Sequence, residues 1–272
     1  MRLGIFAKTF AGTDPAAVLA AVKQAGYETT QFNLACAGLP SMPDAVPANA
    51  VAAIGAAARS SGISLAALSG TYNMAHPDKA ARDDGLRRLA VVIDTAATLD
   101  IPLVTLCTGS RNAADQWAYH PDNSDPSAWS DMAVEMAKAL ALAEEAGVDL
   151  GIEPEQANVV TSAMDATRLI AEMGSKHLKI VLDPANLFEH AKPDGARAIV
   201  AAAIDVAAGH IAMAHAKDRF ADGRFATSGQ GVVDFPDFVA RLKGVGFDGA
   251  LVTHGLPADE APGVAIFLRG LL

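Results

Sequence analysis

The chain has 272 residues, 51% of them hydrophobic and 19% charged, with a formal net charge of −10. This composition is sufficient for a large buried core and differs from that of disordered chains. The negative charge argues against a partner with a phosphate backbone, which favours a basic face, so we expect no binding of nucleic acid.

The opening segment and the most apolar segment predict neither a signal peptide nor a membrane span. The chain opens with MRLGIFAK, which leads into an apolar strand without the regions of a secretory signal. The most apolar stretch, residues 199–214, is interrupted by Asp205 and His210, too soon for a membrane span. Two cysteines, Cys36 and Cys107, are too few for a disulfide framework. We therefore expect a cytoplasmic protein.

Short apolar runs alternate with longer, alanine-rich amphipathic segments along the chain. The apolar runs predict strands at Leu3–Ala7, Thr29–Leu34, Ser64–Ser69, Leu103–Cys107, Asp149–Ile152, Lys179–Leu182, His210–Ala214 and Ala250–Thr253. The segments between them predict helices at Asp14–Ala25, Ala48–Ser60, Lys79–Leu99, Ser127–Ala146, Ser162–Met173, Asp194–Ala208, Phe235–Gly244 and Asp259–Leu271. Glycines expected to cap helix C-termini are Gly26, Gly62, Gly147 and Gly246.

Eight strand–helix pairs without an intervening linker favour one parallel-stranded α/β domain. The number of pairs predicts that residues 1–272 form a single (β/α)8 TIM barrel. An open sheet with a dinucleotide site is the alternative. The sequence after the first strand is FAKTFAGTD, which lacks the Gly-x-Gly-x-x-Gly pattern that such a site requires.

Four polar residues lie at the ends of four consecutive predicted strands: Glu153, Asp183, His215 and His254. In a TIM barrel the carboxyl ends of the strands converge on one rim, where such enzymes build their sites. Carboxylates together with imidazoles suit a divalent metal. We therefore predict one divalent ion, such as Mn²⁺, Zn²⁺, Co²⁺ or Mg²⁺, held by these four side chains.

Two further residues lie two positions after a candidate ligand, so their side chains are expected on the same side of the strand. Glu155 lies two residues after Glu153, so one carboxylate could bind metal while the other carries a proton, although a solvated turn is the alternative. Lys217 follows His215 in the same way and could neutralise an enolate-like oxygen or pair with Asp218. For His254 we consider metal binding, acid/base catalysis and capping of the chain at Gly255.

Two long loops and one glycine-rich segment lie on the expected rim. Residues 35–47 and 108–126 follow the second and fourth strands, and long rim loops usually cover a ligand, although a dimer contact or plain surface is the alternative. The segment 227–231, Thr-Ser-Gly-Gln-Gly, lies where many barrels hold phosphate but contains no basic residue. The residues predicted to bind substrate are Arg111, Trp117, His120, Asn186, Asn73 and His76.

Several motifs together resemble the sugar phosphate isomerase/epimerase family of the xylose-isomerase-like TIM-barrel superfamily. They are GIEPE at 151–155, VLDPAN at 181–186, HAKD at 215–218, GQGVVDFPDFVARLKGVGFDG at 229–249 and LVTH at 251–254. The resemblance covers nearly the whole chain. It implies a TIM barrel that binds one divalent metal and acts on a small carbohydrate-like substrate, and it leaves the oligomeric state open.

The resemblance also implies roles for individual residues. The usual metal ligands of the family are glutamate, aspartate, histidine and glutamate, and the first three match Glu153, Asp183 and His215. In the ketose epimerase branch the first and last glutamates also move the substrate proton. The last is replaced here by His254, so Glu155 or Lys217 is expected to take over one proton transfer.

A nuclease branch of the same superfamily uses three zinc ions and additional histidines from earlier strands. Here the third strand ends in Ser69-Gly70-Thr71 and the fourth in Cys107-Thr108, without a histidine. This difference, together with the negative charge, argues against nuclease activity.

The sequence therefore predicts a metal-dependent isomerase or epimerase of a small sugar, sugar acid or polyol-derived ketone. The reaction would pass through an enediolate that the metal stabilises. One alternative is a lyase or dehydratase that uses the same metal site on a keto-sugar or keto-polyol. Another is a sugar-binding barrel without turnover, which the absence of the second family glutamate keeps open.

Overall fold

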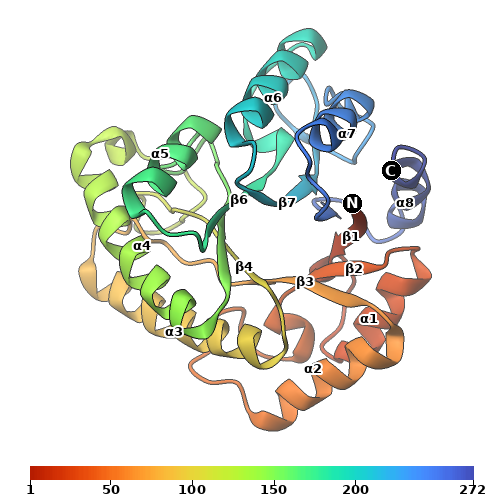
Figure 1. Ribbon diagram of the computed structural model, residues 1–272, viewed down its shortest axis with the longest axis horizontal. Coiled ribbons are helices and arrows are strands. Elements are labelled where there is room, and N and C mark those ends of the chain that lie inside the picture. Colours follow the sequence, from red (N-terminus) through yellow and green to blue (C-terminus); the bar gives the residue numbers. More distant parts are fainter.

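Eight parallel strands form a closed barrel in the computed structural model, which describes residues 1–272. The strands lie in the order β1-β10-β7-β6-β5-β4-β3-β2, and the helices surround them (Figure 1). The barrel strands are β1 (Arg2–Phe6), β2 (Thr29–Phe32), β3 (Ser64–Ser69), β4 (Leu103–Leu106), β5 (Asp149–Ile152), β6 (Leu178–Leu182), β7 (Ile211–Ala216) and β10 (Ala250–Thr253). The predicted (β/α)8 TIM barrel is thus confirmed.

One helix follows each barrel strand. The helices are α1 (Pro15–Gln24), α2 (Ala48–Ser61), α3 (Lys79–Thr98), α4 (Pro126–Ala146), α5 (Ala163–Met173), α6 (Pro193–Ala207), α7 (Phe235–Gly244) and α8 (Ala261–Arg269). Aspartate side chains cap several of them, as when Asp78 accepts a hydrogen bond from the Ala80 amide at the start of α3. At the other end of α2, Gly62 has a φ of 73°, which ends the helix in the left-handed conformation that glycine permits.

The barrel interior changes from apolar to polar along the strands. Leu103, Val181, Met213 and Val252 belong to a buried apolar cluster that is separate from the main core. Gly151 stands among them, and a Cβ there would lie 2.8 Å from a Val181 methyl, so the layer has no room for another side chain. Two residues further along several of these strands, polar side chains replace the apolar ones. The polar layer therefore lies at the carboxyl end of the barrel.

The main core fills the space between the barrel and the helices. It contains 63 buried residues, including Phe32, Leu89, Ile93, Phe235 and Phe238. Each large side chain removed from water contributes about 1.5–3 kcal/mol to folding. This core holds the strands rigidly in register, so it also fixes the positions of the side chains at their carboxyl ends.

The structure adds elements to the rim that the periodicity did not predict. Short 3-10 helices follow four strands or loops, at Ala7–Thr9, Leu34–Ala37, Pro121–Ser124 and Pro184–Asn186. A two-stranded hairpin, β8 (Asp218–Arg219) with β9 (Phe225–Ala226), follows β7. Strand β7 also continues to Ala216, so His215 lies within the strand and not after it.

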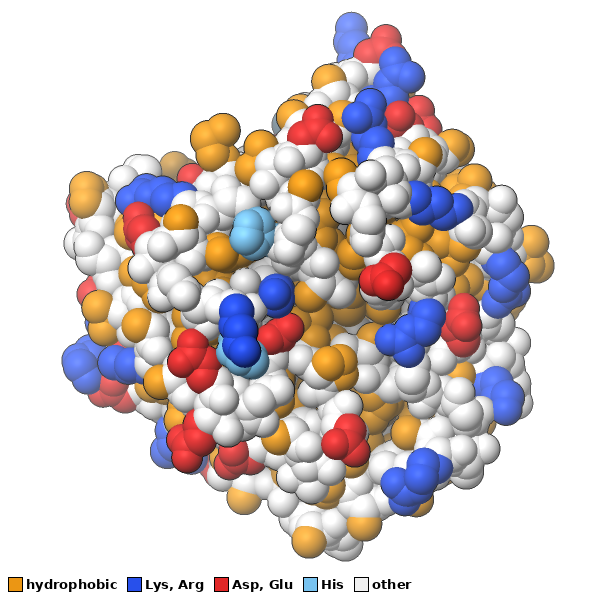
Figure 2. Space-filling model, in the orientation of Figure 1, with side chains coloured by type: hydrophobic (Ala, Val, Ile, Leu, Met, Phe, Trp, Pro, Cys, Tyr) orange, Lys and Arg blue, Asp and Glu red, His pale blue; other side chains and the backbone are white.

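None of the helices is both long enough and apolar enough to cross a bilayer. Over the face in Figure 2, Asp and Glu side chains lie interspersed with Lys and Arg side chains. The formal charge of −10 is therefore not gathered into one patch on this face.

Candidate functional site

A cavity of about 610 Å³ opens at the carboxyl end of the barrel. Side chains at alternate positions of the strands line it, because residues two apart point to the same side of a strand. The pairs are Phe6 with Lys8, Gln31 with Asn33, Ser69 with Thr71, Thr105 with Cys107, Glu153 with Glu155 and His215 with Lys217. Glu153 and Glu155 therefore point to the same side, as do His215 and Lys217, and all four side chains line this cavity.

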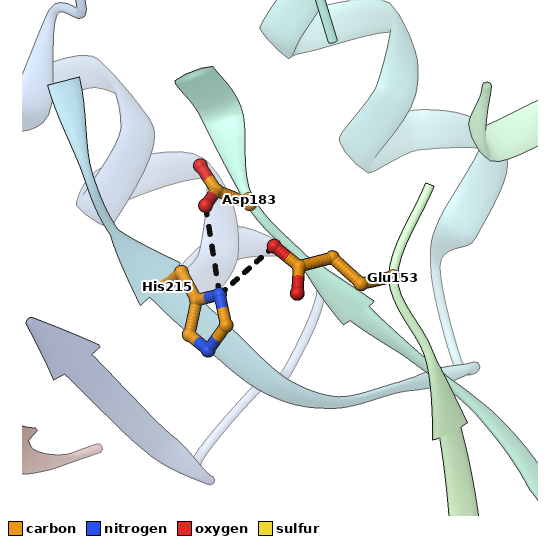
Figure 3. A group of neighbouring side chains, drawn as sticks. All are labelled: Glu153, Asp183 and His215. Carbon is orange, nitrogen blue, oxygen red and sulfur yellow. Dashed lines mark hydrogen bonds and ion pairs between the residues drawn. The ribbon is translucent and has the colours of Figure 1, made fainter. Parts of the chain in front are cut away.

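Glu153, Asp183 and His215 point toward one another at the base of the cavity (Figure 3). Their potential ligand atoms lie within 4.8 Å of one another. His215 Nδ1 is 3.1 Å from Glu153 Oε1 and 3.5 Å from Asp183 Oδ2. Strands β5, β6 and β7 are neighbours in the barrel, so the fold itself brings the three side chains together.

The surroundings keep Asp183 ionised. Its carboxylate is buried, but the Lys217 ammonium and the His215 ring outweigh the cost of burial and hold the pKa of Asp183 well below its usual range. Oδ1 accepts a hydrogen bond from the Ala185 amide at 2.8 Å, whereas Oδ2 is buried without a hydrogen-bond partner. A buried anionic oxygen without a donor is suited to a bound cation.

His215 is buried between the two carboxylates. Burial disfavours its charged form, but the Glu153 and Asp183 carboxylates outweigh this effect and raise the pKa of His215 to about 10. The protonated His215 ring thus balances the negative charge of the two carboxylates. One nitrogen and two carboxylate oxygens are donors that Zn²⁺, Mn²⁺ and Co²⁺ accept, so these residues fit a divalent metal.

Asn186 connects the two glutamates of the cavity. Its Nδ2 donates to Glu153 Oε1 at 2.7 Å and to Glu155 Oε1 at 2.8 Å. Its Oδ1 accepts from Lys217 Nζ at 3.0 Å. Burial and then the neighbouring Glu153 carboxylate raise the pKa of Glu155 to about 8. Glu155 is therefore a carboxyl group whose pKa suits proton exchange near neutral pH.

Lys217 contacts Asp183 and Asn186 and not its sequence neighbour Asp218. Its Nζ lies 3.9 Å from Asp183 Oδ2 and 3.9 Å above the centre of the Phe225 ring. Asp218 instead accepts hydrogen bonds from backbone amides of its own loop, among them those of Gly229 and Gly231. The amides of the glycine-rich segment thus bind an anion of the chain itself.

His254 lies beside the group of three donors and is not part of it. Its ring stacks on Phe6 and on His215, with ring centroids 4.9 Å and 5.2 Å apart. Burial, followed by the positive charges of His215 and Lys217, lowers the pKa of His254 to about 3, so the ring is neutral at pH 7. Its Nδ1 is buried without a hydrogen-bond partner.

Two of the six residues predicted to bind substrate, Trp117 and Asn186, line the cavity. Trp117 extends from the long loop after β4 and is 48% exposed. An exposed aromatic ring at a cavity mouth is suited to an apolar face of a ligand. This loop therefore reaches the cavity, as the sequence predicts.

The other four predicted substrate residues do not line the cavity, because they bind other parts of the chain. Arg111 forms an ion pair with Asp131 at 2.8 Å. Asn73 donates to the carbonyl of Ser110 at 2.8 Å. His76 and His120 accept hydrogen bonds from the amides of residues 78 and 122. These side chains hold the loops after β3 and β4 in place.

Several cavity residues were not identified from the sequence, among them Gln31, Phe6, Arg219 and Phe225. Gln31 lies one residue before the end of β2. Its Nε2 donates to the hydroxyls of Ser69 and Thr105, and its Oε1 accepts a hydrogen bond from His215. The pattern that identifies Glu153, a polar residue after an apolar strand, does not apply to Gln31, because two threonines precede it in β2 and Phe32 follows it. Phe225 lies on the short β8–β9 hairpin, for which the sequence carries no comparable signal.

The structure is similar to solved structures of sugar epimerases. With 3-keto-D-glucoside 4-epimerase from E. coli the TM-score is 0.78, at 17% identity over 99% of both chains. With D-psicose 3-epimerase from Clostridium cellulolyticum H10 it is 0.77, at 17% identity over 100% of this chain and 99% of the other. An L-ribulose 3-epimerase gives 0.76, at 19% identity over 99% and 92%. At these identities the likeness shows a common fold.

Comparison with curated protein sequences finds no match. The family model described as "Xylose isomerase-like TIM barrel" matches residues 19–271, which is nearly the whole chain. This match agrees with the closed eight-stranded barrel and with the resemblance carried by the motifs at the strand ends. The chain belongs to the xylose isomerase-like TIM-barrel family.

Proposed function

We propose that this protein is a metal-dependent isomerase or epimerase of a small sugar, sugar acid or polyol-derived ketone. The observation that carries the proposal is the group formed by Glu153, Asp183 and His215 at the base of a cavity that also contains a carboxyl group with a raised pKa. The similar solved structures are described as epimerases of D-psicose, L-ribulose and 3-keto-D-glucoside, which supports the same class of chemistry.

Glu153, Asp183 and His215 would hold the divalent ion. Three protein ligands leave coordination positions for substrate oxygens, as in other catalytic metal sites. A bound divalent ion supplies positive charge beside the carbonyl oxygen of the substrate and so stabilises the anion that proton removal produces. His254 stays neutral beside these three residues, with its ring stacked on that of His215.

Proton transfer is assigned to the two glutamates that Asn186 connects. Glu155 removes the proton from the carbon next to the substrate carbonyl, and its raised pKa allows it to release that proton again. Return of a proton from Glu153 to the other face of the same carbon would give an epimer, and return of the proton from Glu155 to the neighbouring carbon would give an isomer. Lys217 holds Asn186 in place through its bond to Oδ1 and adds positive charge near the developing oxyanion.

The experiment is a substrate screen in D2O with protein that has been stripped by a chelator and reconstituted with Mn²⁺, Co²⁺, Zn²⁺ or Mg²⁺. We expect deuterium at a carbon next to the carbonyl of a ketose or keto-sugar, together with an epimer or isomer, only in the reconstituted protein. NMR of the products measures both.

Other outcomes of the same screen would overturn the proposal. Loss of water from a keto-sugar would identify a lyase or dehydratase. Binding of a sugar without deuterium exchange under any metal would identify a non-catalytic sugar-binding barrel. Equal turnover in stripped and reconstituted protein would remove the metal from the reaction.

A further inference from the structure

We infer that Gln31 is a positioning residue that keeps the proton of His215 on Nε2 and so leaves Nδ1 free to bind the metal; this inference rests on the metal centre of the proposed function. Gln31 is on β2 and His215 on β7, so the contact crosses the barrel interior. The two residues are 184 positions apart in the sequence.

The two nitrogens of His215 face different partners. Nδ1 points to the oxygens of Glu153 and Asp183 at 3.1 Å and 3.5 Å, where the ion would bind. Nε2 points away from them and lies 2.8 Å from Gln31 Oε1, its one hydrogen-bond partner. A metal-bound imidazole carries its remaining proton on the other nitrogen, so Nε2–H must donate to Gln31 when Nδ1 binds a metal.

The amide of Gln31 is itself held in one orientation. Its Nε2 donates to Ser69 Oγ on β3 and to Thr105 Oγ1 on β4, both at 3.1 Å. Gln31 is only 5% exposed, so its amide has little contact with solvent. With both N–H groups used by the hydroxyls, Oε1 is the atom that remains for His215.

Gln31 forms a hydrogen bond with a nitrogen at the edge of the His215 ring, whereas His254 packs against the face of that ring. His254 stacks on the His215 ring with an interplanar angle of 23°. Stacking restricts the tilt of the ring but does not distinguish its two nitrogens. Without Gln31, a proton on Nε2 would be buried without an acceptor, and a proton on Nδ1 would donate to Glu153 and block the ligand position. Removing the amide therefore disfavours the metal-binding tautomer.

The test uses Zn²⁺ as the probe, with its Kd measured by competition against a chelator. Loss of an outer partner of a metal-bound histidine weakens binding by about 10–100-fold, and we expect this for Gln31→Met. Gln31→Glu restores an acceptor for Nε2–H, and the hydroxyls of Ser69 and Thr105 can turn to donate to it. We expect this variant to bind Zn²⁺ at least as tightly as the wild type, because a carboxylate partner raises the basicity of a metal-bound histidine.

A matched control is Gln156→Met, the same change at another glutamine of the cavity, whose amide donates to the carbonyls of Thr161 and Leu187. We expect wild-type Zn²⁺ affinity for it. Nitrogen-15 NMR of the histidines in the Zn²⁺-loaded proteins reports which ring nitrogen of His215 carries the proton. A general loss of stability would not change that position. The wild type and Gln31→Glu should show a slowly exchanging proton on Nε2 of His215, and Gln31→Met should lose it.

Wild-type affinity and an unchanged Nε2–H signal in Gln31→Met would overturn the inference while the metal centre stood. A wild-type protein that does not bind Zn²⁺ would overturn the metal centre and this inference together. If Gln31→Met does not fold, a Ser69→Ala, Thr105→Val double variant takes its place, because it releases the amide while retaining Gln31. Unchanged Zn²⁺ affinity and an unchanged Nε2–H signal in that variant would contradict the claim that Ser69 and Thr105 orient the amide toward His215.

Discussion

At the scale of single residues, Asn186 connects the two glutamates of the cavity. Its Nδ2 donates to both Glu153 and Glu155, so two carboxyl groups are held close together despite their mutual repulsion. Buried like-charged neighbours raise a carboxyl pKa, and the pKa of Glu155 is raised for this reason as well as by burial itself. Under the proposed function, Glu155 would therefore carry one proton without binding the metal, whereas Glu153 would bind the metal and carry the other.

We predict that Glu155→Gln slows solvent-deuterium exchange into substrate by about 10²–10⁴, the usual contribution of a general acid or base. Metal content should stay at the wild-type level, because Glu155 is not among the three grouped donors. Glu189→Gln is the matched control, since Glu189 also lines the cavity but is exposed. Wild-type exchange in Glu155→Gln, combined with loss of exchange but not of metal in His254→Ala, would assign the proton to His254 instead.

Both cysteines are predicted to resist alkylation in the folded protein. Cys36 and Cys107 are each 2% exposed, and burial raises the pKa of both thiols. Because the thiolate is the reactive form, neither should react with iodoacetamide at pH 8 over the time in which a free thiol reacts fully. Mass spectrometry should find no label in the native state and two labels after unfolding. Rapid labelling of the native protein at either site would contradict the buried placement.

At the scale of elements, the segment between β7 and α7 is organised by one buried aspartate. The carboxylate of Asp218 accepts hydrogen bonds from the amides of Arg219, Gly229, Gly231 and Val233. Gly231 is required there, because a Cβ would lie 2.3 Å from an Asp218 oxygen. This arrangement holds the β8–β9 hairpin, and with it Phe225, at the mouth of the cavity.

We predict that Asp218→Asn lowers the free energy of unfolding by about 1–3 kcal/mol, because an amide group cannot accept all of these N–H donors and leaves buried ones unpaired. Thermal or urea unfolding measures the change. The control is Asp222→Asn in the same hairpin, whose side chain pairs with Arg224 at the surface. A surface change of this kind should stay within about 0.5 kcal/mol. Equal effects of the two substitutions would argue against the role of Asp218.

At the scale of the whole molecule, the proposed metal centre would join neighbouring strands of a closed barrel. Its ligands come from β7 and from the ends of β5 and β6, strands that are also held by the main core. A ligand that binds the folded state and not the unfolded state stabilises the fold by mass action. Metal binding should therefore be visible in global stability as well as in activity.

We predict that chelation lowers the melting temperature, measured by calorimetry. At a free metal concentration 100 times Kd the stabilisation is about 2.7 kcal/mol, which corresponds to roughly 5–10 °C for a chain of this size. The Glu153→Ala, Asp183→Ala double variant should show no difference with and without metal. Stoichiometric metal retained by that variant would place the ion elsewhere.

The sequence by itself determined the barrel and the placement of Glu153, Asp183 and His215 at its carboxyl end. Strands and helices are specified by local periodicity and by caps, so the expected elements agree with the structure to within a few residues. Parallel strands also force their carboxyl ends onto one rim. Strand order therefore predicts that Glu153, Asp183 and His215 lie close together. It does not explain why His254, at the end of the neighbouring β10, lies outside the group; that depends on side-chain packing.

Only the tertiary structure decided which way the loop side chains and the remaining polar residues point. Arg111 and His76 belong to a loop-rich region of the rim, but their contacts are made inside the chain, because partners such as Asp131 and the Ala113 carbonyl lie close by in space. The contact between Gln31 and His215 joins strands 184 residues apart. Such pairings depend on barrel closure and side-chain packing, which no local pattern of residues encodes.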